Sequence, residues 1–236
     1  MEKKIEQILL KSEIKPTKQI VDNFIKYYNL LIEGNKICNL TAITDEDGVV
    51  EKHFYDSIFP QKYFSLNAKV LDIGAGAGFP SFPLKLVRDD LSFTLLDSLN
   101  KRINFLNNTI QTLNLKNIEA IHGRAEDFAK LSDYREKFDI TTARAVANLK
   151  VLSEYCLPFV KVGGQFIAYK SGNCEEEINE AKQIICELGG KISKVIDYNI
   201  GENSRKLVII EKIKETPKKY PRPTKQIKNS KQGAKI

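Results

Sequence analysis

The chain of 236 residues carries a net charge of +7 and is 42% hydrophobic, with a mean hydropathy of −0.31, as expected for one globular domain with small additions. Its sequence contains no apolar run long enough to cross a bilayer and no apolar signal segment near its start, so we expect a cytoplasmic protein without membrane contact. The four cysteines are far apart and form no C-x-x-C pair, which argues against a zinc site or a disulfide framework.

Residues 1–50 predict a small helical extension. Thr17 can cap a helix whose apolar residues recur at helical spacing (Ile20, Phe24 and Leu31), and Gly34-Asn35 is expected to end it. An acidic loop over 44–48 follows. A second helix is expected over 51–59, with Pro60 ending it.

From about residue 68 the pattern alternates between strands and helices, which indicates a parallel sheet. Parallel strands are expected over 69–73, 92–97, 118–122, 138–142 and 165–169, with Gly163-Gly164 turning into the last. Helices are expected over 100–113, 149–157 and 175–188, and a closing antiparallel hairpin over 192–198 and 205–211. The predicted fold is α/β and Rossmann-like, with a mostly parallel seven-stranded sheet over 51–216 and a basic tail over 217–236.

The most informative stretch runs from Val70 to Pro80. An apolar segment ends in Asp72 and then turns through three glycines at every second position: Gly74, Gly76 and Gly78. This predicts a buried strand and a loop that approaches a ligand closely, because glycine allows positive φ and has no Cβ. A second apolar strand ends in Asp97. A glycine loop followed by an acid at the next strand end is how a doubly wound sheet holds a nucleoside.

The glycine spacing separates two cofactors. Dinucleotide loops carry G-x-G-x-x-G, whose third glycine lets the helix receive a pyrophosphate, whereas Phe79 stands at that place here. The G-x-G-x-G pattern after an acid resembles the first motif of S-adenosylmethionine-dependent methyltransferases. S-adenosyl-L-methionine is therefore the expected cofactor, with Asp97 accepting hydrogen bonds from both ribose hydroxyls. The plainer interpretation of Asp97 is an exposed turn acid.

Two further loops should lie at the carboxyl ends of strands, where ligands bind in open α/β sheets. Ala125 and Glu126 would meet the adenine, although Glu126 could instead cap the next helix. Arg144 follows the fourth strand, and its guanidinium could fix a phosphate, a base edge or the cofactor carboxylate; a surface salt bridge is the alternative. Arg144 is a positioning candidate, and no catalytic residue is identified.

Several neighbouring residues have open roles. Phe79 could contact the cofactor, stack on a target base or belong to the core, and Asp72 could orient the glycine loop. Lys101 and Arg102 could meet RNA phosphates or be solvated. The two histidines, His53 and His122, lack metal-ligand spacing, so no metal is assigned.

The excess positive charge belongs to the end of the chain. Of the 37 basic residues, seven lie in 218–236 without any acid, and the remaining 30 equal the 30 acidic residues. Such a tail attracts phosphate backbones without reading their sequence. The alternatives are a solubilising or disordered end and, more weakly, an anionic membrane surface, since the tail lacks an amphipathic face.

The loop after the fourth strand also limits the acceptor. Exocyclic-amine methyltransferases share an (Asp/Asn)-Pro-Pro-aromatic motif there, but this chain has Ala143-Arg144-Ala145-Val146. Carbon-5 cytosine methyltransferases need a thiolate, usually after proline, and Cys156-Leu157-Pro158 does not supply that order. Guanine N7 has a free lone pair and needs neither device, so the reaction would require mainly in-line positioning.

Taken together, the chain resembles the bacterial 16S ribosomal RNA guanine-N7 methyltransferase family, also called glucose-inhibited division protein B. The matching segments are Asn39–Thr41, His53–Ser57, Asp72–Pro80, Leu96–Arg102, Arg124–Glu126, Ala143–Val146 and Lys219–Arg222. The resemblance implies cofactor contacts at Gly74, Phe79, Ala125, Glu126 and Arg144. It also implies a guanine at position 527 of 16S RNA as the target and the small ribosomal subunit as the partner. The tail departs from the family pattern at 223–226.

Two other functions compete with this one. A non-catalytic RNA- or ribosome-binding protein with a vestigial pocket is disfavoured by the intact glycine loop and Asp97. A nicotinamide-dependent oxidoreductase is disfavoured by Phe79 in place of glycine. A methyltransferase acting on another acceptor is a further alternative. A monomer is expected, while the sequence does not distinguish naked RNA, an assembly intermediate and the mature subunit as substrates.

Overall fold

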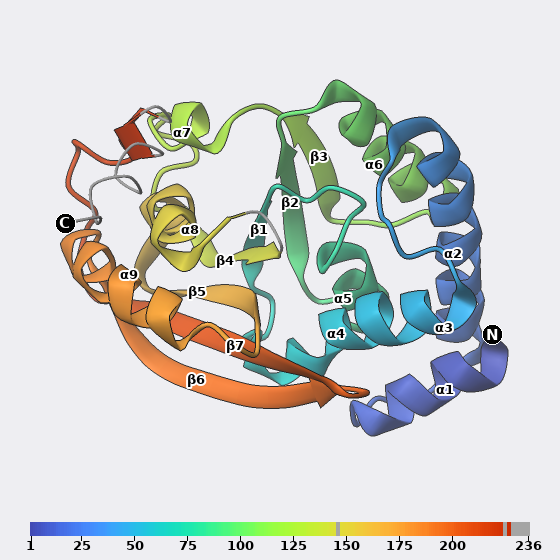
Figure 1. The fold of residues 1–236 in the computed structure, drawn as a ribbon. Coiled ribbons are helices and arrows are strands. Elements are labelled where there is room, and N and C mark those ends of the chain that lie inside the picture. The colour runs from blue at the N-terminus through green and yellow to red at the C-terminus, as the bar shows by residue number, and fades with distance from the viewer. Residues whose placement is uncertain (145–146, 224–225, 228–236) are drawn as a thin grey trace. The chain divides into compact units, whose positions relative to one another are not determined.

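A computed structural model describes residues 1–144, 147–223 and 226–227 (Figure 1). The chain forms two compact units, Met1–His122 with Asn199–Asn203 and Gly123–Tyr198 with Ser204–Ile236. The strands form a seven-stranded sheet in the order β3-β2-β1-β4-β5-β7-β6. The predicted mostly parallel α/β architecture is therefore confirmed. The domain boundaries at 50 and 216 stay predictions.

In the first unit, three parallel strands have the predicted bounds: β1 (Lys69–Ile73), β2 (Ser92–Asp97) and β3 (Ile118–His122). They lie side by side in Figure 1. Strand β1 is buried at every position after Lys69, as expected for a parallel strand covered on both faces. Two helices return the chain between the strands, α5 (Ser81–Val87) and α6 (Asn100–Thr112).

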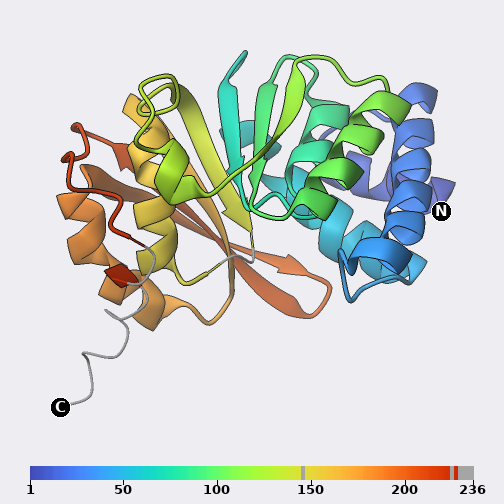
Figure 2. The same ribbon diagram turned by 90° about the horizontal axis from the view of Figure 1, so that it is seen from above.

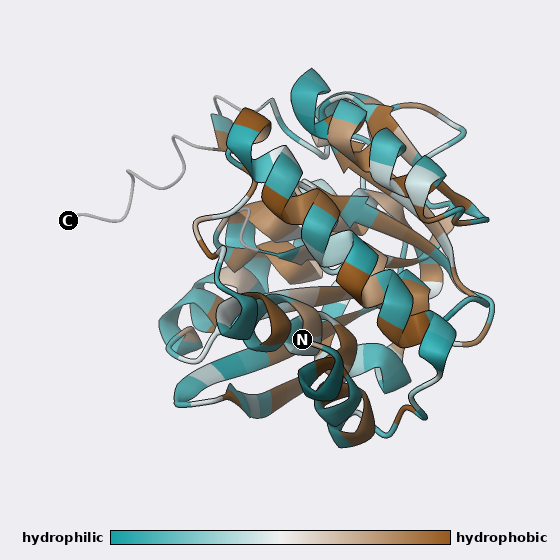
Figure 3. Ribbon diagram, turned by 90° about the vertical axis from the view of Figure 1, so that its right-hand side faces the viewer, coloured by the Kyte–Doolittle hydropathy of each residue, from teal (hydrophilic) through white to brown (hydrophobic). Residues whose placement is uncertain are grey.

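The N-terminal part of this unit is helical, as predicted, but its bounds differ. Its elements are α1 (Glu2–Lys11), α2 (Lys18–Cys38), α3 (Glu46–Val49), the π-helix η1 (Val50–Tyr55), α4 (Asp56–Ile58) and the 3-10 helix η2 (Phe59–Tyr63). Thr17 caps α2 as predicted. Hydrophilic and hydrophobic residues alternate along these helices, as one buried face requires (Figure 3).

One predicted helix end in this region is wrong and another is confirmed. Helix α2 continues through Gly34 to Cys38, and glycine stands at position 34 because the ring of Phe105 from α6 packs on the helix there. A Cβ at Gly34 would lie 2.5 Å from that ring. The helix end predicted before Pro60 is found within one residue, because α4 ends at Ile58 and Pro60 lies in the first turn of the 3-10 helix η2 that follows.

The second unit contains α7 (Ala125–Phe128), β4 (Phe138–Arg144), α8 (Leu149–Cys156), η3 (Leu157–Phe159), β5 (Val160–Ser171), α9 (Glu175–Glu187), β6 (Gly190–Ile200) and β7 (Asn203–Lys212). Strands β4 and β5 are parallel, and β5 and β7 antiparallel. Helices α8 and α9 lie beside each other in this unit (Figure 2).

One turn prediction in this unit is wrong. Gly163-Gly164 lies inside β5 and not before it. The register between β4 and β5 shifts between Phe138 and Ile140, and a Cβ at Gly164 would lie 2.4 Å from the carbonyl oxygen of Asp139. Glycine is therefore required because two backbones pass closely at an irregularity in the sheet.

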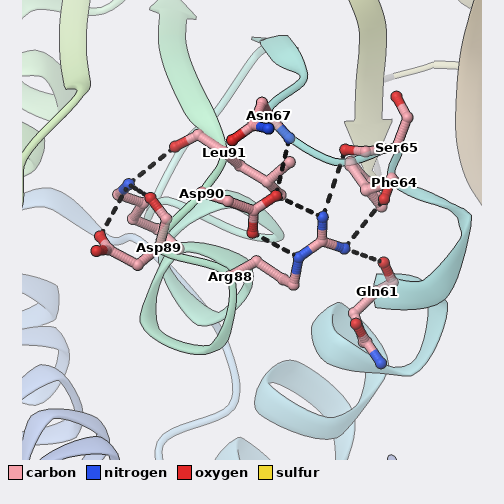
Figure 4. A network of polar contacts seen from close by, with 9 residues as sticks. Gln61, Phe64, Ser65, Asn67, Arg88, Asp89, Asp90 and Leu91 are labelled. Carbon is pink, nitrogen blue, oxygen red and sulfur yellow. Dashed lines mark hydrogen bonds and ion pairs between the residues drawn. The ribbon is translucent and has the colours of Figure 1, made fainter.

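At the amino ends of β1 and β2, Arg88 joins two loops of the first unit (Figure 4). Its guanidinium donates to the carboxylate of Asp90 at 2.7 Å and to the carbonyl oxygens of Gln61 and Phe64 at 2.8 and 3.0 Å. The Arg88 side chain holds the pKa of Asp90 down at about 2. This network fixes the end of the sheet opposite the glycine loop.

The beginning of the basic tail is folded onto the second unit. Arg222 donates to the carboxylate of Glu154, a helix α8 residue that is 1% exposed. The hydroxyl of Tyr220 donates to Glu187 at 2.5 Å, and burial together with this bond raises the pKa of Tyr220 to about 12. Arg222 is thus engaged in a contact within the protein. The other predicted tail cations include Lys225, Lys228, Lys231 and Lys235, which lie outside the described residues.

Candidate functional site

The predicted glycine loop follows β1 and has the predicted backbone. Gly74, Gly76 and Gly78 have φ values of 72°, 59° and 94°, all in the region that favours glycine. The amide of Gly74 donates to the carbonyl oxygen of Leu96 at 2.8 Å. This bond joins the start of the loop to the carboxyl end of the neighbouring strand β2.

Asp97 ends β2 and organises the same loop. Its carboxylate accepts hydrogen bonds from the amide of Gly76 at 2.9 Å and from the amide of Leu99 at 2.9 Å. The guanidinium of Arg102 in α6 lies 3.4 Å from it. Asp97 is only 3% exposed, so the interpretation as an exposed turn acid is wrong. Two amides donate to this carboxylate and a guanidinium lies beside it, and carboxylate oxygens can also accept hydrogen bonds from the hydroxyls of a ligand.

Glycine is needed at Gly76 and at Gly78 for different physical reasons. A Cβ at Gly78 would lie 2.1 Å from the ring of Phe82, so Gly78 is required by packing within the protein. A Cβ at Gly76 would meet only the carbonyl oxygen of Gly74, at 3.7 Å. Gly76 therefore borders open space beside the Asp97 carboxylate, and this is where the loop can accept a ligand.

Phe79 is mostly buried, with 7% of its surface exposed. Its ring stacks on the imidazole of His53 at a centroid distance of 4.5 Å and lies 5.5 Å from the ring of Tyr27. The hydroxyl of Tyr27 donates to the carbonyl oxygen of Ala77 at 2.8 Å. The N-terminal helices therefore hold the outer half of the glycine loop, a role that the sequence did not reveal.

Two other predicted residues support the loop from within the first unit. Asp72, which is fully buried, accepts a hydrogen bond from the hydroxyl of Ser81 at 2.6 Å. This bond links the end of β1 to the first residue of α5. Lys101 is exposed at the start of α6 and also borders a pocket of about 330 Å³ between α2 and α6. None of the predicted cofactor residues lines that pocket.

In the second unit, Ala125 and Glu126 open α7 directly after the loop that follows β3. Ala125 is buried, and the carboxylate of Glu126 lies 3.7 Å from the guanidinium of Arg124. Glu126 is in the first turn of the helix, where a negative charge is favourable. Both interpretations of Glu126, cofactor contact and helix stabilisation, are compatible with this place.

Arg144 is the last residue of β4 and pairs in register with Tyr169 of β5. The following residues Ala145 and Val146 lie outside the described residues. Lys170, next to Tyr169, donates to the carbonyl oxygen of Ala147 at 3.0 Å and pairs with Glu177 of α9 at 2.5 Å. Lys170 and Glu177 were missed by sequence reasoning, because the residues that they join are far apart in the chain.

The structure thus brings together the glycine loop, Phe79, Asp97 and Arg102 within the first unit. Ala125, Glu126 and Arg144 lie in the second unit, and their meeting with the first set stays a prediction. The part of the chain that the structure describes contains no group of three or more His, Cys, Asp or Glu residues that could hold a metal. No helix in the described ranges is long and apolar enough to span a membrane.

Comparisons with known proteins bear on both the family and the fold of this chain. The chain matches the family model described as GidB, rRNA small subunit methyltransferase G, over residues 20–208. It is 52% identical over 205 residues to the ribosomal RNA small subunit methyltransferase G of Clostridium botulinum, covering 85% of this chain and 86% of that protein. It is 51% identical over 218 residues to the protein of the same name from Staphylococcus aureus, covering 91% of each.

Solved structures share the fold at low identity. A SAM-dependent methyltransferase from Aquifex aeolicus superimposes with a TM-score of 0.54 at 20% identity, covering 76% of this chain and 97% of that one. TYW2 of M. jannaschii in complex with AdoMet superimposes with a TM-score of 0.56 at 16% identity, covering 73% and 80%. These similarities support the predicted Rossmann-like class I methyltransferase fold.

Proposed function

Since the chain belongs to the rRNA small subunit methyltransferase G family, we propose that it transfers a methyl group from S-adenosylmethionine to N7 of guanine 527 in 16S ribosomal RNA. The single observation that supports this function most strongly is the glycine loop clamped to Asp97 through the amide of Gly76. It is the nucleoside-holding device of the fold, in a chain that is about half identical to proteins named as rRNA methyltransferases.

The residues present fit S-adenosylmethionine. When bound, this cofactor supplies an electrophilic methyl group on a positively charged sulfur. Gly76 borders open space beside the buried carboxylate of Asp97, and Asp97 would accept hydrogen bonds from the ribose hydroxyls. Phe79, Ala125, Glu126 and Arg144 complete the proposed contact set, with Ala125 and Glu126 at the adenine.

The chemistry of the acceptor explains why no general base is needed. Guanine N7 carries a lone pair in its neutral form, so attack on the methyl carbon requires no prior deprotonation. The protein must hold the two reactants in line and exclude wrong orientations, which can account for a large part of the rate. Arg144 at the end of β4 is the candidate for holding the RNA or the cofactor carboxylate.

The partner is 16S RNA, presented by a small ribosomal subunit or its precursor, and the basic tail adds affinity for the phosphate backbone. The exposed Lys218 and Lys219 are the described tail cations suited to this. We place the protein in the cytoplasm, where bacterial ribosomal subunits are made, and expect it to act as a monomer without a metal. Light scattering and metal analysis of the purified protein test the last two points.

The deciding experiment is a transfer assay with methyl-labelled S-adenosylmethionine. Small subunits, protein-free 16S RNA and DNA are offered in parallel, and N7-methylguanine is mapped by borohydride–aniline cleavage. Cleavage at one guanine of 16S RNA is expected. No transfer to either RNA substrate, together with tight binding of S-adenosylhomocysteine, would retain the cofactor and reject the acceptor.

A further inference from the structure

The proposed function does not use His53, although this histidine lies directly against the glycine loop. His53 belongs to the π-helix η1, a rare conformation that often occurs at functional sites. Its imidazole is nearly parallel to the ring of Phe79, with an interplanar angle of 28° and centroids 4.5 Å apart. Phe79 directly follows Gly78, so the histidine touches the end of the loop predicted to bind the cofactor.

Both ring nitrogens of His53 have fixed partners. Nδ1 lies 3.2 Å from the carbonyl oxygen of Lys52, and Nε2 lies 2.7 Å from the hydroxyl oxygen of Thr41. A carbonyl oxygen can only accept, so Nδ1 carries the proton. In the neutral ring Nε2 is then an acceptor, and the hydroxyl of Thr41 donates to it.

Thr41 is itself held in place. Its hydroxyl oxygen accepts a hydrogen bond from the amide of Ile43 at 3.1 Å, and its amide donates to the side-chain oxygen of Asn35 at 2.8 Å. Asn35 lies in α2. The ring of His53 is therefore oriented by a chain of hydrogen bonds that begins on a long helix, and its flat face is pressed on Phe79.

We propose that Thr41 and His53 form a positioning pair for the methyl transfer, in which the oriented imidazole fixes the ring of Phe79 at the end of the proposed cofactor loop. This rests on the proposed function. A transfer that uses no general base depends on alignment, and a misplacement of about 1 Å can lower the rate about 100-fold. Phe79 has limited freedom, because Tyr27 packs on it and holds the carbonyl oxygen of Ala77. The contact with His53, oriented by Thr41, restricts the remaining movement of the Phe79 ring.

The test compares four variants in the transfer assay with 16S RNA. His53→Ala and Thr41→Val should lower kcat about 10- to 100-fold, while KM for RNA changes less than about threefold. His53→Gln, whose amide can still accept from Thr41, should recover part of the rate. Glu51→Gln, an exposed position on the same π-helix, is the matched control and should leave kcat unchanged.

Thermal unfolding and binding of S-adenosylhomocysteine are measured on the same variants. A kcat within twofold of the wild type in folded His53→Ala and Thr41→Val would overturn the proposal. A loss of activity in both variants that only matches their loss of folded protein would overturn it as well. A wild-type protein that binds S-adenosylhomocysteine but methylates no RNA would instead reject the proposed function, and this inference with it.

Discussion

The carboxylate of Asp97 accepts a hydrogen bond from the amide of Gly76, 21 residues earlier in the chain, over a distance of 2.9 Å. The acid at the end of one strand therefore shapes the loop that follows its neighbour. The proposed ligand binding and the observed loop geometry both involve this side chain, and the first prediction follows from that proposed double role.

Replacement of Asp97 by asparagine should weaken S-adenosylhomocysteine binding at least about tenfold and lower the free energy of unfolding by about 1 to 3 kcal/mol. The asparagine side chain keeps one accepting oxygen and puts an NH2 donor at the other position, so it faces either the amide of Gly76 or the amide of Leu99 with a donor. Titration calorimetry and urea unfolding measure the two effects. Asp22→Asn, an exposed change on α2, is the control. Unchanged affinity in Asp97→Asn would remove this residue from the site.

The two glycines bordering Ala77 should respond differently to alanine. Gly78→Ala should cost about 3 kcal/mol of stability, because the added Cβ would meet the buried ring of Phe82 at 2.1 Å. Gly76→Ala has room for its Cβ and should cost about 1 kcal/mol through its positive φ. Its main effect should be a loss of S-adenosylhomocysteine affinity. Equal affinity in Gly76→Ala and wild type would show that the ligand does not approach this position.

Breaking the pair between Arg222 and Glu154 should destabilise the second unit. Arg222→Ala leaves a carboxylate that is 1% exposed without its guanidinium, and loss of one partner of a buried pair costs about 3 to 5 kcal/mol. Urea unfolding measures this cost. Lys218→Ala, an exposed neighbour, should change stability by less than about 0.5 kcal/mol. A loss below about 1 kcal/mol in Arg222→Ala would mean that water replaces the arginine.

The end of the tail should contribute affinity for RNA without contributing stability. Deleting 228–236 removes three lysines, and the slope of log K against log salt for RNA binding should fall by about 2 to 3 units. The melting temperature should not change, because the folded start of the tail is held through Tyr220 and Arg222. A deletion from 218 onward removes those contacts too, and should lower the melting temperature. An unaltered salt slope after the shorter deletion refutes the affinity role.

Asp90 makes part of the stability dependent on pH. Its pKa is lowered to about 2 by hydrogen bonds from Arg88, so the folded protein favours the ionised form. The contribution is present above the unfolded pKa of about 4 and is lost as the pH falls toward 2. Asp90→Asn should lower the free energy of unfolding by about 2 kcal/mol at pH 7, and the difference should vanish near pH 2. Acid titrations of both proteins at fixed urea measure this. If the difference in unfolding free energy between the wild type and Asp90→Asn persisted at pH 2, its cause would be the altered packing of the side chain and not the lost charge.

The strands around the glycine loop could be predicted to the residue, and most of the N-terminal region could not. Strands β1 and β2 are continuous apolar runs that end in an acid, and buried parallel strands have few other sequence patterns. Gly34 was expected to end a helix, whereas glycine is needed there because the ring of Phe105, 71 positions away in the chain, packs against it. Local pattern carries no information about such a partner.

The same limit applies to the site. The chain positions of Gly76 and Asp97 predicted that these two residues meet, because the pattern is built on local spacing, and the structure confirms the contact. Binding of a nucleoside there stays a prediction. The contacts of His53 with Thr41 and Phe79 join three segments that no local pattern connects. The pairing of Glu154 with Arg222 spans 68 positions. Because of this pairing, a part of the tail that was expected to contact RNA belongs to the folded structure of the protein.

The pairing of Glu154 with Arg222 also has a consequence for how the chain is made. Synthesis proceeds from the N-terminus, so α8 leaves the ribosome well before residue 222 does. Until then the carboxylate of Glu154 has no guanidinium to offset its burial, and the second unit is held short of its final stability. Completion of this unit is thereby tied to a late moment of translation, and nascent chains arrested before Arg222 should remain open to proteases that the finished protein resists.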